Sequence, residues 1–176
     1  MKRWHYYGLA VGGALAIGAS GAVMAQAPAD DAAYAGTIWE QLVSQRLVGP
    51  DALGAVPYAR EGQAHGATLV TFQSVITVDG VTGPVLIKRS YTDAATRGGI
   101  IAHPNENLEN VTVMFQREDG YDAANQDWFW AMYAPTGMVG QMDGMNMAGQ
   151  VTMCSGCHAT APGNDYIFLH DGMGGM

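Results

Sequence analysis

The spacing of hydrophobic residues changes once along the chain, close to residue 50. On the N-terminal side, apolar residues recur every four positions in two series: Tyr34, Ile38 and Leu42, then Trp39, Val43 and Leu47. This period places them on one face of a helix. Asp30 and Asp31 can cap its N-terminus, and Gly49-Pro50 ends it. We therefore predict an amphipathic helix from Asp31 to Val48.

Beyond His65 the pattern becomes that of β-strands. Short runs rich in Val, Ile, Thr, Phe and Tyr are separated by the turn sequences Asp79-Gly80, Asp119-Gly120 and Pro135-Thr136-Gly137. The predicted strands cover residues 67–78, 85–91, 111–117, 127–133 and 165–169. We therefore predict an α+β fold, a mainly antiparallel β-sheet with one N-terminal helix.

The strand predicted at residues 127–133 carries three adjacent aromatic residues. Alternate residues of a strand point to opposite faces of the sheet. We therefore expect Trp128 and Trp130 on one face and Phe129 on the other. For each of them taken singly, a core or dimer contact is the expected role.

The N-terminus has the features of a secretory signal peptide. Lys2 and Arg3 precede an uncharged run over residues 6–24, and Val23-Met24-Ala25 supplies the small residues of a cleavage point. The run approaches the roughly 20 residues that span a bilayer, but its many glycines and alanines make it a weak span. We predict a signal peptide at residues 1–25, export to the periplasm, and a single domain over residues 26–176.

The charge of the chain limits its partners. Lys and Arg number 8 against 16 Asp and Glu, which gives a formal net charge of -8. Such a surface is a poor match for nucleic acid or anionic lipid. A small neutral or cationic substrate, or a basic redox partner, is compatible with it.

The segment Cys154-Ser155-Gly156-Cys157-His158 contains both cysteines of the chain. Its spacing, C-x-x-C-H, is typical of c-type haem attachment. The two thiols add to the haem vinyl groups as thioethers, and the imidazole becomes the proximal ligand of the iron. We predict one covalent haem c held by Cys154, Cys157 and His158 near the C-terminus of the sheet domain, with His158 on the metal.

Three other interpretations of the two cysteines are weaker. A thioredoxin-like redox pair would need a βαβ unit and a helix that opens at the motif. A zinc site would need a second pair of ligands at suitable spacing, and the sequence offers none. A structural disulfide is the third. The segment lies between a Met-Gly-rich stretch and an Ala-Pro-Gly-Asn turn, which favours haem.

The sixth ligand of the iron is left open by the sequence. His65, His103 and His170 are candidates, as are the methionines of segment 138–153: Met138, Met142, Met145, Met147 and Met153. Most of them are expected to serve as surface or packing residues. The series formed by Met142, Met145 and Met147 also resembles a thioether site for Cu(I), and its glycine-rich composition equally suits a flap over the haem.

Several pieces of the chain, in the same order, are similar to the cytochrome P460 family. They are His65-Gly66, the run GPVLIK at 83–88, VTVMF at 111–115, Gly120-Tyr121-Asp122, DWFW at 127–130, the haem motif, and NDYIF at 164–168. The resemblance implies a homodimeric, mostly antiparallel β-fold with a five-coordinate c-type haem. Enzymatic members oxidise hydroxylamine toward nitrous oxide, whereas the related cytochromes c′-beta bind nitric oxide.

Lys88 ends an apolar strand, where a long amine is unexpected. It is the only lysine beyond the predicted signal peptide. In the family, a lysine at the end of a matching Val-x-x-Lys strand bonds covalently to the haem macrocycle. The alternative is a lysine with its amine in water, on a solvated edge that Arg89 would share.

The resemblance leaves three functions open: a hydroxylamine-oxidising enzyme, a nitric oxide-binding protein and an electron-transfer cytochrome. The enzyme needs an open position on the iron, a soluble electron acceptor and a group that takes up protons. Asp143, Glu118 and Asp127 are the acids available for that last role, and Asp143 lies shortly before the haem motif. A methionine or histidine on the sixth position would indicate the electron carrier.

Overall fold

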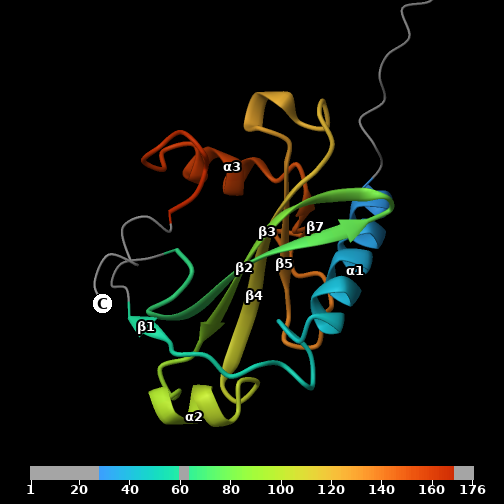
Figure 1. Ribbon diagram of the computed structural model, residues 1–176. Coiled ribbons are helices and arrows are strands. Elements are labelled where there is room, and N and C mark those ends of the chain that lie inside the picture. Colours follow the sequence, from blue (N-terminus) through green and yellow to red (C-terminus); the bar gives the residue numbers. More distant parts are fainter. Residues whose placement is uncertain (1–27, 60–63, 169–176) are drawn as a thin grey trace, which may run out of the picture.

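The described part of the chain comprises residues 28–59 and 64–168 of a computed structural model (Figure 1). The predicted signal peptide, residues 1–25, lies outside these residues and stays a prediction, as does the single domain over residues 26–176. Among the described residues, no helix is long and apolar enough to cross a membrane.

The N-terminal helix α1 covers Pro28–Ser44 and is amphipathic as predicted. Ile38 and Leu42 are completely buried in the core. Proline suits the start of a helix, because the first N–H groups have no intrahelical partner. The predicted end at Val48 is wrong by four residues, because Arg46 adopts a left-handed conformation (φ 58°) and turns the chain before Gly49.

The strands form a six-stranded antiparallel sheet in the order β1-β2-β3-β4-β5-β8, which confirms the predicted fold class (Figure 1). They are β1 Tyr58–Ala59, β2 Thr68–Val78, β3 Val81–Tyr91, β4 Leu108–Gln116, β5 Trp128–Tyr133 and β8 Ala148–Gly149. Between β5 and β8 the chain forms a small hairpin, β6 Gln141–Met142 and β7 Met145–Asn146. Asp79 and Gly80, both at positive φ, make the two-residue turn between β2 and β3, as expected for hairpins of this length.

Three short helical segments escaped the sequence prediction: α2 Arg97–Ala102, the 3₁₀ turn Ala123–Asn125 and α3 Thr152–His158. The strand predicted at residues 165–169 is wrong over its described part, which contains no strand. There Tyr166 has a φ of 65°, and the Asp165 carboxylate accepts a hydrogen bond from the Ile167 N–H at 2.9 Å. This local turn replaces a sheet ladder.

The two faces of the sheet pack against different parts of the chain. Phe129, Tyr133 and Ile87 lie on one face and form the main core with Ile38 and Leu42 of α1. On the opposite face, a second cluster is buried against the segment that contains α3: Leu86, Met114, Trp128 and Trp130. The predicted separation of Phe129 from Trp128 and Trp130 is therefore confirmed. Helices α1 and α3 lie on opposite sides of the sheet (Figure 1).

The outer edge of β2 is mostly without a partner strand among the described residues. Only its first two residues pair with β1, through Ala59 with Thr68 and Tyr58 with Leu69. Farther along this edge, the side chain of Gln45 donates a hydrogen bond to the Val75 carbonyl at 3.0 Å and accepts one from the Ser74 hydroxyl at 2.6 Å. A side chain thus takes one of the positions that a neighbouring strand would use.

The division between the faces leads to a stability prediction. Phe129 is completely buried, whereas Val75 is 58% exposed. Phe129→Ala is expected to lower the free energy of unfolding by about 3–5 kcal/mol, because it removes a large core side chain and leaves a cavity. Val75→Ala is the matched control and is expected to change it by less than about 0.5 kcal/mol. Urea unfolding followed by fluorescence measures both, and equal losses would contradict the assignment of the core face.

Candidate functional site

A cavity of about 210 Å³ lies on the sheet face opposite α1. Its wall is mainly apolar and comes from β3, β4, β5, the Met-rich segment after β5, and α3. Strand register explains the sheet side of this wall. Lys88 pairs with Thr112, and Thr112 with Met132, so these three side chains form one row across the face. Leu86, Met114 and Trp130 form the next row.

The haem motif lies on α3, at the mouth of this cavity. Cys154 and Cys157 are free thiols, and both line the cavity together with His158. The motif is helical, so the helix that a redox pair would need is present. No βαβ unit surrounds it, however, because every strand pairing in the described sheet is antiparallel. Burial, reinforced by the neighbouring Cys157, raises the pKa of the Cys154 thiol to about 11. Redox-active cysteine pairs have a lowered thiol pKa, so this environment does not favour that interpretation.

His158 is buried and held in one orientation. Its Nδ1 lies 2.7 Å from the backbone carbonyl of Tyr166, and because a carbonyl only accepts, Nδ1 must carry the proton. The ring also contacts Trp130 and Phe168, with centroid distances of 4.8 and 5.3 Å. Burial lowers the pKa of His158, and the charge of Lys88 adds to this, while the bond to Tyr166 acts in the opposite direction. The neutral ring therefore keeps its Nε2 lone pair for a metal, the arrangement usual for metal-ligating histidines.

His65 is the second imidazole of the cavity wall. Its ring centroid lies 6.0 Å from that of His158. Its Nδ1 is 3.4 Å from the Thr112 hydroxyl, at the long end of the hydrogen-bond range. Burial, followed by the charges of Lys88 and His158, lowers the pKa of His65 to about 4. His65 is therefore neutral at neutral pH.

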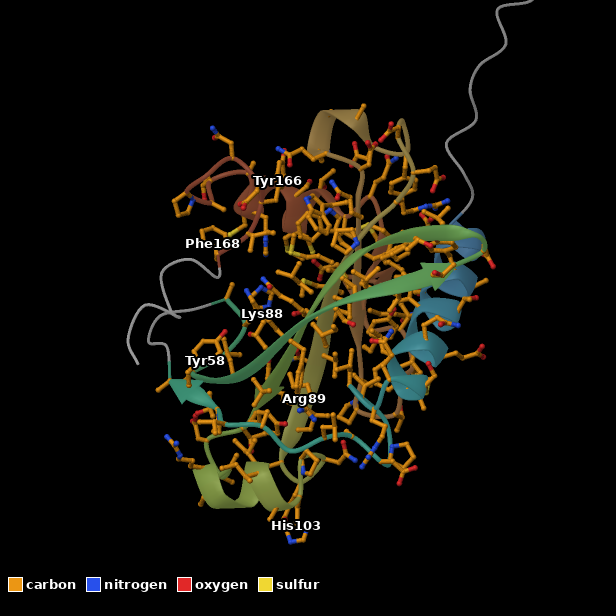
Figure 2. All side chains as sticks on the ribbon, viewed as in Figure 1. Tyr58, Lys88, Arg89, His103, Tyr166 and Phe168 are labelled. Carbon is orange, nitrogen blue, oxygen red and sulfur yellow. The ribbon has the colours of Figure 1, made fainter. Side chains whose placement is uncertain are left out.

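Lys88 lines the same cavity, on the face of β3 that points away from α1 (Figure 2). The expectation of a solvated edge shared with Arg89 is wrong for Arg89, which is completely buried. Arg89 points to the other face, where it donates to the Leu53 carbonyl at 2.7 Å and lies over the Phe72 ring. Lys88 is thus placed beside the haem motif, although the bond to a macrocycle stays a prediction.

The methionines of segment 138–153 lie in different environments. Met142, Met147 and Met153 line the cavity, and Met147 is nearly completely buried. Met138 and Met145 are 71% and 67% exposed. The three methionines of the Cu(I) series are therefore divided between the cavity and the solvent-facing side of the β6–β7 hairpin.

The remaining candidates lie away from the cavity or outside the described residues. Asp143 is exposed in the β6–β7 turn at a φ of 51° and does not belong to the cavity wall. Its role as a proton acceptor stays a prediction. His103 caps the C-terminus of α2, away from Lys88 (Figure 2), and His170 lies outside the described residues. Glu118 forms an ion pair with Arg117, and Asp127 accepts hydrogen bonds from the backbone of Gly120 and Asp122.

The residues of the cavity fit a covalently attached haem. Two thiols and an imidazole with a free Nε2 project from one short helix into an apolar space. In addition, the indole N–H of Trp130, which lines the cavity, is buried without a hydrogen-bond partner. A buried donor is costly unless it is paired, and haem carries carboxylates that can accept a hydrogen bond from it. Among the described residues, no group of three or more His, Cys, Asp and Glu side chains is placed to hold a metal ion directly.

Sequence reasoning missed several members of this site. The Tyr166 carbonyl is a backbone group and leaves no signal in the residue type. Thr112 and Asn110 enter the cavity wall through the register between β3 and β4, which strand patterns do not reveal. Trp130 was expected to share a face of its strand with Trp128, but the alternation did not say which face lines the cavity. Its unpaired N–H and its contact with His158 follow only from the packing.

The family model for Cytochrome P460 matches residues 77–169, slightly more than half of the chain. The match includes Lys88, the aromatic strand β5 and the haem motif. No curated protein and no solved structure is significantly similar to the chain.

The unpaired indole of Trp130 leads to a prediction that depends on haem. Trp130→Phe keeps an aromatic ring against His158 but removes the N–H donor. If a haem carboxylate accepts from this donor, the substitution is expected to cost the haem-loaded protein about 1.5–3 kcal/mol more than the haem-free protein. Chemical unfolding of both forms measures the difference. Trp39→Phe, on α1 and packed against the main core, is the control and should affect both forms alike. An equal effect of Trp130→Phe on the two forms would contradict the prediction.

Proposed function

Because the chain belongs to the cytochrome P460 family, we propose that it is a periplasmic c-type cytochrome that oxidises hydroxylamine to nitrous oxide. The observation that carries the proposal is His158. Its Nδ1 is tied to the Tyr166 carbonyl, and its Nε2 is left for a metal, on the same helix as two thiols and beside an apolar cavity. The acidic composition and the features of the N-terminus support export and a basic or neutral electron acceptor.

The residues of α3 would hold the haem. Cys154 and Cys157 supply the two thioethers, and His158 supplies the proximal nitrogen. When bound, the haem iron supplies the one-electron chemistry that hydroxylamine oxidation requires. The Tyr166 carbonyl fixes the imidazole and strengthens it as a ligand, since a hydrogen bond from the other ring nitrogen raises ligand basicity.

The cavity wall supports a small protic substrate. Leu86, Met114 and Met147 give it an apolar lining that excludes water. Asn110 and Thr112 add polar groups that can orient an N–H or O–H donor. Two hydroxylamine molecules yield one nitrous oxide, one water, four protons and four electrons, and the electrons leave to a soluble acceptor.

Nitric oxide binding without turnover is the second candidate function. It is favoured by the apolar lining and by the exposed position of Asp143, which leaves no carboxylate of the described chain in the cavity wall. In this case the protein would resemble a cytochrome c′-beta. For both functions the family resemblance supports a homodimer.

The enzymatic proposal is tested by the products of turnover. Haem-loaded protein is mixed with hydroxylamine and an artificial electron acceptor, and nitrous oxide is measured by gas chromatography. We expect one nitrous oxide for every four electrons transferred. His158→Ala should abolish turnover, whereas His103→Ala, at the far end of α2, should leave it unchanged. Tight nitric oxide binding with no nitrous oxide formed would overturn the enzymatic proposal in favour of gas binding.

The predicted bond between Lys88 and the haem is tested separately. Joining Nζ to a macrocycle carbon removes one hydrogen from each, a two-electron oxidation for which a peroxide, reduced to water, is a suitable oxidant. Peptide mass mapping of the holoprotein should show the haem peptide, residues 154–158, linked to the Lys88 peptide at two hydrogens less than the summed mass. Lys88→Arg should give the haem peptide alone. If the unsubstituted protein also gives the haem peptide without a link to Lys88, the prediction is wrong.

A further inference from the structure

Thioethers make up a large part of the cavity wall. Seven methionines lie within residues 28–59 and 64–168, and five of them line the cavity: Met114, Met132, Met142, Met147 and Met153. Methionine thus supplies five of the 17 residues of the wall, although it accounts for only 11 of the 176 residues of the chain. Hydroxylamine oxidation as proposed above uses none of these sulfur atoms.

The five methionines of the wall come from several elements. Met114 and Met132 belong to β4 and β5 of the sheet. The other three come from the chain after β5: Met142 in β6, Met147 between β7 and β8, and Met153 in α3, one residue before the first cysteine of the haem motif. A haem held in this cavity would therefore meet thioethers from the sheet and from the segment that follows it.

Among these methionines, the position in the wall and the exposure to solvent are not correlated. Met147 is only 5% exposed, and its backbone is fixed by two hydrogen bonds. Its N–H donates to the Gly140 carbonyl at 2.8 Å, and its carbonyl accepts from the Met132 N–H at 2.9 Å. The two described methionines outside the wall, Met138 and Met145, are 71% and 67% exposed. An oxidant in solution would reach these two first.

A thioether takes up one oxygen atom from a peroxide and becomes a sulfoxide. The O–O bond of the peroxide breaks, an S–O bond forms, the sulfur loses two electrons, and hydrogen peroxide is reduced to water. Peroxide is a stronger oxygen donor at a haem iron than in solution. It is also the oxidant that suits the bond predicted for Lys88, and on that prediction peroxide enters this cavity.

We propose that the five methionines of the wall are oxygen acceptors that protect the haem site: peroxide that reacts there converts their thioethers to sulfoxides before it destroys the haem. This inference rests on the haem attachment proposed above, but not on hydroxylamine oxidation. It gives the Met-rich segment a chemical role in addition to packing. The acceptors are renewable in principle, because methionine sulfoxide is reduced enzymatically back to methionine.

The order in which the methionines are oxidised tests the proposal. The ferric holoprotein is treated with a limiting amount of hydrogen peroxide and digested, and mass spectrometry measures the sulfoxide at each methionine. We expect Met142 and Met147 to be oxidised before Met138 and Met145. Cyanide, which occupies the iron, should reverse this order. Oxidation of Met138 and Met145 first in the absence of cyanide, or an order that cyanide leaves unchanged, would overturn the proposal.

Haem survival tests the protective role. Leucine replaces methionine with little change in volume and removes the sulfur. The triple variant Met142→Leu, Met147→Leu and Met153→Leu should lose its Soret absorption in peroxide several-fold faster than the unsubstituted holoprotein. The double variant Met138→Leu and Met145→Leu is the matched control and should bleach at the unsubstituted rate. Equal rates for the two variants would contradict protection, and the oxidation order, which needs no variant, remains decisive if the triple variant does not fold.

The same holoprotein separates this inference from the proposed reaction. If the methionines of the wall are oxidised first but hydroxylamine gives no nitrous oxide, the inference stands and the enzymatic proposal fails. If nitrous oxide forms but Met138 and Met145 are oxidised first, the enzymatic proposal stands and the inference fails. A digest that contains no haem peptide would overturn both.

Discussion

The alternation of side chains along β3, β4 and β5 is the constraint on which both halves of the structure depend. Ile87 packs beneath α1, and its neighbour Lys88 points into the cavity on the other side. Phe129 and Trp130 are divided in the same way. Because a shift of one residue in register would exchange every such pair, the core under α1 and the site against α3 determine each other. Burial of the apolar residues under α1 fixes the strand register, and the register in turn positions the residues of the site.

The site itself is completed by a segment that is neither helix nor strand. Residues 163–167 turn back over α3, with Asn164 and Tyr166 in left-handed conformations, so that the Tyr166 carbonyl meets His158. The phenol of the same residue reaches the 3₁₀ turn, where it lies 3.3 Å from the Asn125 side chain. Left-handed backbone is unfavourable for such residues unless the surroundings enforce it. The orientation of the His158 imidazole therefore depends on the packing of the whole loop 163–167.

Sequence patterns predicted the structure correctly where apolar residues recur at the regular spacing of a helix or a strand. The four-residue spacing in α1 and the alternation in β2 to β5 reproduce the observed elements, and the haem motif located the site. The patterns failed where a single interaction decides the outcome. Arg46 ends α1 early through one left-handed residue, and the run at 165–168 looks like a strand by composition but is needed as a turn under His158. His65 and Thr112 could be recognised as neighbours only once the strand register was known.

The open edge of β2 has a consequence for how the protein behaves among copies of itself. An unpaired strand edge is a template for another chain, and proteins commonly blunt such edges. Here Gln45 binds the Val75 carbonyl and the Ser74 hydroxyl, so a foreign strand could pair along β2 only after displacing it. Gln45, the residue that follows α1, thereby opposes edge-to-edge aggregation, a role separate from the contribution of α1 to the core.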